Sequence, residues 1–153
     1  KSQADRGCGA RVIIVDTNVI SETLRPRCNE AVIEWLDAQA VETLYITSIN
    51  AAELWAGVAV LPNGARKRKI ESSLDDVLAR LFGARTLDFD FRAARRYGDL
   101  VQRMAAAGTP LPLADGLIAS IALANHFVVA TRDIAPFHAA GVQVVDPWAF
   151  RGK

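Results

Sequence analysis

The chain has 153 residues, of which 51% are hydrophobic and 23% are charged. This length and balance suit a single domain with a buried core and exclude a disordered chain. The formal net charge of +1 does not indicate a nucleic-acid binder, so an anionic substrate would be held by local basic patches or by metal ions.

The first ten residues are polar and are expected to be a flexible or artificially added leader, ahead of one folded domain at 11–150. The two cysteines, Cys8 and Cys28, form neither a disulfide framework nor a zinc pattern, which is typical of reduced cytoplasmic thiols. The long stretch 104–131, in which Asp115 is the one charged residue, also contains Pro and Asn residues and makes a poor membrane span. We therefore expect a soluble cytoplasmic protein that does not associate with membranes.

The first half of the chain alternates short apolar runs with helical patterns. Residues 12–15 are a β-branched run that ends at Asp16, which predicts a buried parallel strand. A helix is expected at about 29–39, then a strand at 44–47. Ser48 is expected to cap the next helix, which Pro62-Asn63-Gly64 stops.

The second half continues this alternation. An amphipathic helix is expected at 65–82, a short strand at 86–87, and a helix that Asp90 caps and that ends at Gly108. The residues of that last helix expected to face inward are Ala94, Tyr97, Val101 and Met104.

A nearly uniformly apolar helix is then expected at about 114–125, followed by strands at 127–130 and 142–145. Strands that alternate with helices predict an α/β fold. We expect an α/β/α sandwich with a mainly parallel central sheet of four to five strands.

Three carboxylates stand alone in otherwise uncharged sequence. Asp16, Glu53 and Asp115 are the only charged residues of the stretches 12–21, 43–65 and 104–131, respectively. The helix that carries Glu53 is apolar nearly all round and is expected to be buried. A buried carboxylate is costly unless it is paired or binds a metal, and none of the three has a basic neighbour one helical turn away.

A fourth acid, Asp133, follows the strand 127–130 as Asp16 follows 12–15. The carboxyl ends of parallel strands are where open α/β sheets bind ligands. Oxygen ligands alone select a hard cation, so the expected ion is Mg²⁺, with Mn²⁺ as a substitute. Alternatively, each of the three aspartates caps a helix and Glu53 reaches solvent.

Four segments resemble the motifs of PIN-domain nucleases. Val15-Asp16-Thr17-Asn18-Val19-Ile20-Ser21 resembles the first motif, and Ala52-Glu53-Leu54-Trp55-Ala56-Gly57 with Leu61-Pro62 the second. Asp115-Gly116-Leu117-Ile118-Ala119 is similar to the third. Thr131-Arg132-Asp133, with Phe137, Gly141 and Asp146-Pro147-Trp148, resembles the fourth motif and the tail of the VapC/FitB-like toxin branch.

The resemblance implies a PIN fold and a Mg²⁺-dependent endoribonuclease that is the toxin of a toxin–antitoxin pair. It also implies an RNA substrate, a homodimer or a hetero-oligomer, and inhibition by a cognate antitoxin protein. The family's catalytic and metal-binding acids fall on Asp16, Glu53, Asp115 and Asp133. Many relatives have Asn at the position of Asp133 and Asp at the position of Pro136.

Several polar residues near the acids are candidates for supporting roles. Thr17, Asn18 and Thr131 could hydrogen-bond the metal ligands or cap turns. The basic clusters 66–69 and 92–96 could contact RNA or form solvated helix faces, and Arg25 and Arg27 are better placed to reach a bound strand.

Two other functions remain as alternatives. A different Mg²⁺-dependent phosphoryl-transfer enzyme is disfavoured because the chain contains no DxDx[TV] signature and no nucleotide-binding glycine loop. A catalytically silent binding module on the PIN scaffold is disfavoured because such a module has no evident need for four uncompensated acids.

Overall fold

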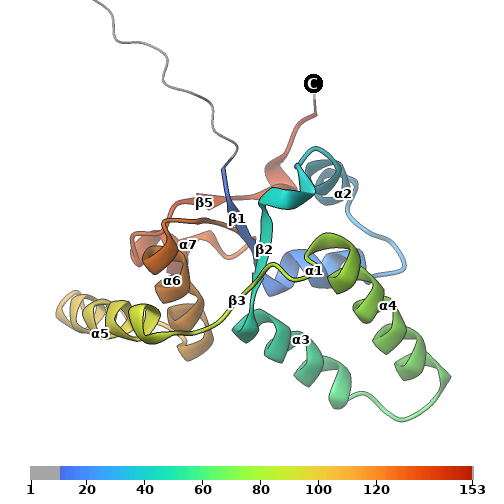
Figure 1. Ribbon diagram of the computed structural model, residues 1–153, viewed down its shortest axis with the longest axis horizontal. Coiled ribbons are helices and arrows are strands. Elements are labelled where there is room, and N and C mark those ends of the chain that lie inside the picture. The colour runs from blue at the N-terminus through green and yellow to red at the C-terminus, as the bar shows by residue number, and fades with distance from the viewer. Residues whose placement is uncertain (1–10, 153) are drawn as a thin grey trace, which may run out of the picture.

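A five-stranded sheet forms the centre of the computed structural model, which describes residues 11–152 (Figure 1). The expected leader at 1–10 lies outside the described residues. The strand order is β3-β2-β1-β4-β5, and every neighbouring pair is parallel. The strands are β1 (Ile13–Val15), β2 (Leu44–Thr47), β3 (Thr86–Leu87), β4 (Val128–Ala130) and β5 (Val144–Val145).

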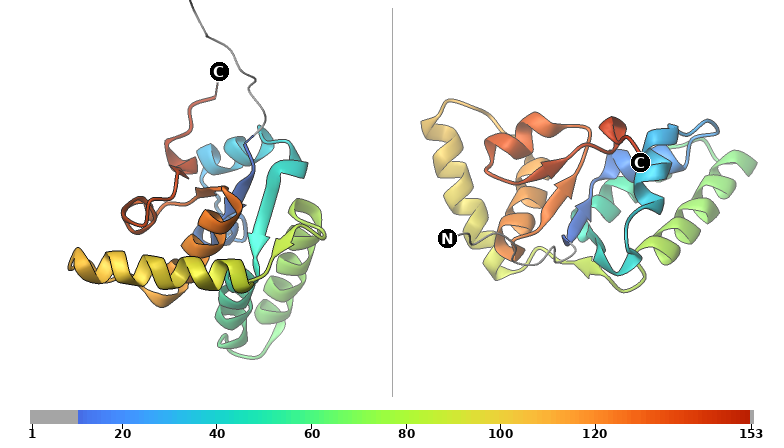
Figure 2. Two further views of the ribbon diagram at one scale, coloured as in Figure 1. Left: turned by 60° about the vertical axis from the view of Figure 1, so that its left-hand side comes forward. Right: turned by 90° about the horizontal axis from the view of Figure 1, so that it is seen from above.

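Helices cover both faces of the sheet (Figure 2). On one face lie α1 (Thr17–Thr23), α2 (Glu30–Asp37), α3 (Ser48–Ala59) and α4 (Ala65–Leu81). On the other face lie α5 (Phe91–Ala106), α6 (Leu113–Asn125) and α7 (Ile134–Ala139). The expected three-layer sandwich with a parallel sheet is confirmed. Two short 3₁₀ turns, η1 (Val41–Thr43) and η2 (Pro147–Ala149), complete the described elements.

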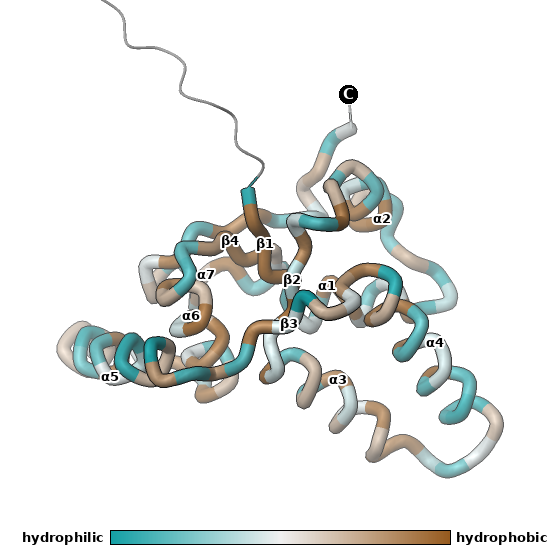
Figure 3. Tube along the Cα trace, viewed as in Figure 1, coloured by the Kyte–Doolittle hydropathy of each residue, from teal (hydrophilic) through white to brown (hydrophobic). Residues whose placement is uncertain are grey.

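The central strand β1 divides the core between the two layers. Ile13 and Val15 belong to the cluster under α1–α4, whereas Ile14 belongs to the cluster under α5–α7. This alternation follows from the two-residue period of a strand, and burial on both faces explains why the run contains no polar residue. The strands β1 and β4 are accordingly hydrophobic (brown) in Figure 3.

The chain reverses its direction of progress through the sheet at β1. From β1 it moves outward to β2 and β3, and it then returns to the other side of β1 as β4 and β5. Such a reversal places the carboxyl ends of two adjacent strands at the start of diverging connections, and ligands bind there in open α/β sheets. The segments that begin at Asp16 and at Thr131 leave from this point.

The helix α5 differs from its expected orientation. Its buried residues are Ala93, Leu100 and Met104, whereas Ala94 and Val101 are exposed. The expected face was therefore wrong by about one position, although Met104 and the half-buried Tyr97 fit it. The cap at Asp90 is confirmed, because its side chain accepts a hydrogen bond from the Ala93 N–H.

The helix α3 also departs from expectation. Its cap is Thr47 rather than Ser48, and only Asn50, Leu54 and Val58 are buried. Ile49 and Ala51 are partly buried against the core clusters, whereas the other small and apolar residues of this helix, from Ala52 through Ala59, are exposed unless they lie on this face. A composition that is apolar all round does not by itself show which face is covered. Among residues 11–152, no helix has both the length and the apolar character to cross a membrane.

Candidate metal and phosphate site

Asp16 occupies the junction between β1 and α1. Its backbone N–H donates to the Ala130 carbonyl at 2.9 Å, which ties the end of β1 to the end of β4. Its carboxylate accepts the Thr17 N–H at 2.8 Å and so caps α1. The side chain is only 5% exposed. The capping alternative for this residue is confirmed, but it accounts for only part of the environment of the carboxylate.

Two further side chains hold the Asp16 carboxylate. The Thr131 hydroxyl donates to Oδ2 at 2.7 Å, and Asn50 Nδ2 donates to Oδ1 at 3.0 Å. These hydrogen bonds lower the pKa of Asp16, but burial outweighs them and the pKa is raised. The carboxylate is therefore oriented on both oxygens while its negative charge remains costly. That is the condition in which a bound cation would stabilise it.

Asn50 is a fully buried residue that sequence reasoning missed. Its side chain and that of Thr47 form a reciprocal capping box at the start of α3, with the Thr47 N–H donating to Asn50 Oδ1 at 3.2 Å. The same amide donates through Nδ2 to Asp16 and to Thr17 Oγ1, the latter at 3.1 Å. The cap of one helix thus fixes the acid at the start of another. The T-x-x-N spacing at 47–50 was the available signal.

Glu53 lies on the exposed side of α3, so the expectation that it is buried was wrong. It is nevertheless linked to the same cluster, because the Thr17 hydroxyl donates to Glu53 Oε1 at 2.9 Å. Glu53 is exposed to solvent, as the alternative interpretation expected. Its side chain is held beside Asp16 through Thr17 and Asn50.

Asn18 connects the cluster to Asp133. Asn18 Nδ2 donates to Thr131 Oγ1 at 3.2 Å and to Asp133 Oδ2 at 3.4 Å. The Asp133 N–H donates to the Thr131 hydroxyl at 3.0 Å. Asp133 occupies the N-cap position of α7, as the capping alternative expects, but its side chain makes no capping hydrogen bond to this helix. Hydrogen bonds to the acids are thus donated by all three expected supporting residues: Thr17 donates to Glu53, Asn18 to Asp133 and Thr131 to Asp16.

Asp115 stands in the first turn of α6 and is not a cap, because the cap position is Pro112. Among the described residues no side-chain or backbone group hydrogen-bonds its carboxylate. Burial and the negative charges of Asp16, Glu53 and Asp133 raise the pKa of Asp115 to about 6. These charges act on Asp115 because the four acids, though distant in sequence, are close in space.

The four acids line one pocket of about 600 Å³ together with Thr17 and Asn18. Within residues 11–152 no three His, Cys, Asp or Glu side chains are already closed around a single ion position. The chemistry of the donors nonetheless fits a hard divalent cation: all four are carboxylates, and none is in an ion pair among the described residues.

The remaining pocket-lining residues share a helical spacing that was not used in the sequence analysis. Asn18, Ser21 and Glu22 stand at the i, i+3 and i+4 positions of one face of α1, and Arg25 follows just beyond the end of this helix; all four line the pocket. Glu22 is a buried acid that accepts the Asn29 N–H at 2.8 Å. The polar face of α1 is therefore directed to the site. Arg132 and Trp148 also line the pocket.

The other expected nucleic-acid contacts do not reach this pocket. The basic residues of 66–69 and 92–96, and Arg27, are absent from its lining, whereas Arg25 is present. Arg92, Arg95 and Arg96 line a separate depression beside Phe91.

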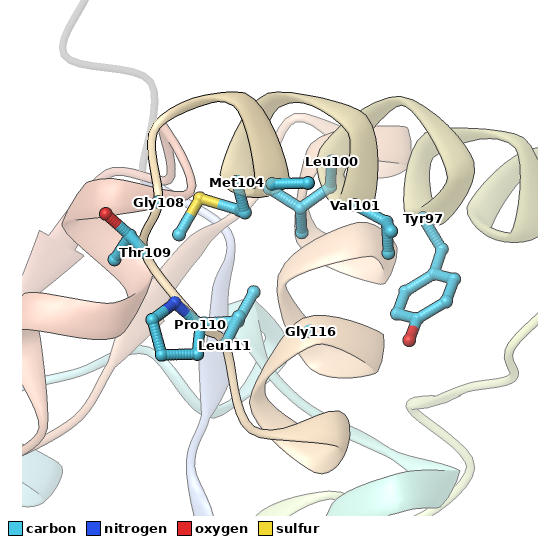
Figure 4. Close-up of a pocket in the computed structure, with 10 residues that line it drawn as sticks. Tyr97, Leu100, Val101, Met104, Gly108, Thr109, Pro110, Leu111 and Gly116 are labelled. Atoms are coloured by element: carbon cyan, nitrogen blue, oxygen red, sulfur yellow. The ribbon is translucent and has the colours of Figure 1, made fainter.

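A second, mainly apolar hollow of about 490 Å³ lies between α5 and the start of α6 (Figure 4). It is lined by Leu100, Met104 and Leu111, among others, and by no carboxylate. Because it offers neither charge nor metal ligands, the candidate chemistry belongs to the acid pocket.

Comparison with known proteins gives a consistent result. The PIN domain family model matches residues 13–142. The chain is 47% identical over 137 residues to the plasmid stability protein StbB of Pseudomonas syringae pv. tomato, which covers 90% of this chain and 99% of that protein. It is 42% identical over 137 residues to VapC ribonuclease Y4jK of Sinorhizobium fredii, with 90% and 98% covered. The crystal structure of FitAcB from Neisseria gonorrhoeae superposes with a TM-score of 0.84 at 42% identity, with 90% and 99% covered.

Proposed function

Because this chain belongs to the PIN domain family, we propose that it is a metal-dependent endoribonuclease and the toxin of a toxin–antitoxin pair. One observation carries the proposal. Four carboxylates from four separate segments line one pocket, and none is in an ion pair among residues 11–152. The similarity to a VapC ribonuclease supports the same activity. The catalytic domain would span residues 11–150 and act in the cytoplasm.

Asp16 and Asp115 are the residues that we propose to bind Mg²⁺ directly. Glu53 would hold a second ion or position a water molecule, and Asp133 would act through water. Mn²⁺ would substitute, because both ions take oxygen ligands. The chemistry that a bound ion supplies to such a site is a lowered pKa of a coordinated water and neutralisation of the charge that develops on the phosphate oxygens.

The protein's own contribution is orientation of the acids before substrate arrives. Thr131 and Asn50 fix the two oxygens of Asp16, and Thr17 fixes Glu53. Asn18 holds the Asp133 side chain near the same point. Such hydrogen bonds set the direction of the metal-binding lone pairs, and their loss commonly costs tenfold or more in metal affinity or activity.

The proposed partners follow from the family and from the relatives. The substrate is RNA, the inhibitor is a cognate antitoxin protein, and the chain assembles as a homodimer or as a hetero-oligomer with that antitoxin. The 42% identity to VapC ribonuclease Y4jK supports RNA as the substrate.

The decisive experiment is cleavage of a panel of structured RNAs by the purified protein in Mg²⁺, Mn²⁺ or EDTA. We expect cutting in either metal, none in EDTA, and none by Asp16→Ala. Asp37→Ala is the matched control, because it removes an exposed acid of α2 that does not line the pocket.

Two outcomes would count against the proposal. Cutting by Asp16→Ala at the wild-type rate would show that the activity does not come from this site. Absence of cutting, together with no Mg²⁺ binding by calorimetry, would favour a catalytically silent scaffold.

A further inference from the structure

Two arginines, Arg25 and Arg132, line the pocket that contains the four acids, and only Arg25 forms an ion pair among residues 11–152. The Arg25 guanidinium lies 3.3 Å from Glu22 Oε2, so its charge is partly compensated by a buried carboxylate. Arg132 lies in no ion pair among residues 11–152. An exposed, uncompensated cation in a pocket rich in carboxylates would be expected to turn toward one of them.

The backbone at Arg132 is anchored in the site. The Arg132 N–H donates to Asn18 Oδ1 at 3.3 Å. The residues on either side are also bound: Thr131 donates to Asp16, and the Asp133 N–H donates to Thr131. The start of the Arg132 side chain is therefore fixed by the same network that orients the acids.

The guanidinium of Arg132 is held by an aromatic ring instead of by an acid. Arg132 Cζ lies 5.1 Å from the centroid of the Trp148 ring. Trp148 sits in η2, where its backbone N–H donates to Asp146 Oδ1 at 2.9 Å, and its half-buried side chain packs against the core cluster under α1–α4. The ring is thus a rigid support rather than a mobile surface group.

A guanidinium over a ring face keeps its N–H donors available at its edges. No side-chain hydrogen bond from Arg132 to another described residue uses these donors. Planar, paired N–H groups match the geometry of two phosphate oxygens. The arrangement leaves an oriented cation without an ion-pair partner in a pocket whose carboxylates repel an anionic strand.

We infer that Arg132, supported by Trp148, binds a backbone phosphate of the RNA at the acid pocket. This inference rests on the proposed nuclease function and adds a substrate-binding residue to it. Trp148 has a positioning role: it holds the guanidinium in place of an acid, so that the charge stays available to the strand.

The test is RNA affinity as a function of KCl concentration, measured by fluorescence anisotropy with a labelled RNA from the cleavage panel. Asp115→Asn is used as the background so that the RNA stays intact. Arg132→Met is compared with Arg132→Lys and with Arg80→Met. Arg80 is an exposed arginine of α4 outside the pocket, so its variant makes the same change in net charge.

We expect Arg132→Met to weaken binding roughly tenfold and to reduce the slope of log affinity against log salt by about 0.7. Arg132→Lys should keep the slope, because the charge remains, but bind less tightly, because the paired donors are lost. Arg80→Met should match the background protein. An Arg132→Met protein with unchanged affinity and slope would overturn the inference.

Cleavage by the same substitutions in the otherwise wild-type chain separates this inference from the proposed function. If the wild-type protein cuts RNA and Arg132→Met leaves the salt slope of RNA binding unchanged, the inference about Arg132 is overturned and the nuclease proposal stands. A wild-type protein that binds RNA but neither cuts it nor binds Mg²⁺ overturns the nuclease proposal, and the slope comparison still decides whether Arg132 contacts RNA. A protein that neither binds nor cuts RNA overturns both.

Discussion

Asp115 is a carboxylate whose negative charge is disfavoured by its surroundings. Its pKa is raised to about 6 by burial and by the charges of Asp16, Glu53 and Asp133. Between pH ~4 and ~6 the folded protein therefore binds more protons at this position than the unfolded chain does. The metal-free protein should lose stability as the pH rises through this window, and above pH ~6 the full penalty should be present.

Asp115→Asn removes this charge while keeping the side-chain shape. We expect the metal-free variant to be at least as stable as the wild type at pH ~7, with a flatter dependence of stability on pH between ~4 and ~6. Cleavage and Mg²⁺ affinity should be lost. Urea denaturation in EDTA across this pH range measures the first effect, and calorimetry the second. A variant that cuts RNA at the wild-type rate would contradict the assigned site.

Asn50→Ala tests whether the capping box supports the site. The substitution removes the hydrogen bond from the Thr47 N–H to Asn50 and the two hydrogen bonds that Asn50 donates to Asp16 and Thr17. A buried group that loses its hydrogen-bond partner costs about 1–3 kcal/mol, and a group that keeps another partner, as Asp16 and Thr17 do, costs less. We expect the free energy of unfolding to fall by about 2–4 kcal/mol, and Mg²⁺ affinity to fall among the molecules that remain folded. Urea denaturation and calorimetry measure these effects.

The matched control is Asn63→Ala, which removes an exposed asparagine between α3 and α4. An Asn50→Ala protein as stable as this control would show that the hydrogen bonds of Asn50 do not contribute the expected free energy of unfolding.

The difference between these residues shows what sequence reasoning can find at this scale. Asp16 and Asp115 stood out because each was a lone charge in apolar sequence. Asn50 did not stand out, because a neutral amide in a helix has many harmless roles and its buried partners come from another element. Glu53 also stood out and lines the acid pocket, but its exposure could not be inferred from the residues around it.

At the scale of elements, α6 ends in an unusual way. Its C-terminal cap is His126, which has a φ of 59° in the left-handed region, the one non-glycine residue with positive φ among those described. An L residue pays about 1–2 kcal/mol for this conformation. Glycine avoids that strain but loses roughly 0.5–1 kcal/mol more backbone entropy on folding.

We therefore expect His126→Gly to raise the free energy of unfolding by up to about 1 kcal/mol. The second histidine of the chain is the control. His138 lies within α7, so His138→Gly should destabilise the protein by roughly 0.5–1 kcal/mol. Both values come from urea denaturation. Destabilisation of similar size by both substitutions would show that the conformation at His126 carries no strain that glycine relieves.

The elements also show where periodicity succeeds and where it fails. The strand β1 and the helix α4 were predicted almost to the residue, because a buried β-branched run and a long amphipathic stripe each match one period. The faces of α5 and α3 were misjudged. Alanine-rich and small-residue helices give a weak contrast between their sides, so the packing partners decide which side is covered.

At the scale of the whole molecule, several large apolar side chains remain in contact with solvent. Val60 is 83% exposed and Phe91 is 94% exposed, and Trp55 and Leu113 are also exposed. Large exposed apolar residues favour association, because covering them removes apolar surface from water. They are consistent with the proposed dimer.

We expect the chain to sediment at micromolar concentration with twice its mass of 16.6 kDa. Sedimentation equilibrium measures this directly, and repetition in high salt distinguishes apolar association, which persists, from association through surface charge. A single species of monomer mass would contradict the proposed homodimer.

The sequence by itself determined the α/β class, most strands and helices, and the four acids, because these depend on local period, on capping residues and on lone charges in apolar runs. The tertiary structure decided which of these residues meet. The reversal of the chain at β1 brings the ends of β1 and β4 together, so Asp16, Thr131 and Asn18 share hydrogen bonds across more than a hundred residues of sequence. It also decided that Glu53 is exposed and that Arg132 rests on Trp148. The local sequence pattern indicates whether a residue is suited to burial. Its hydrogen-bond partners and neighbouring charges depend instead on how separate helices and strands pack together.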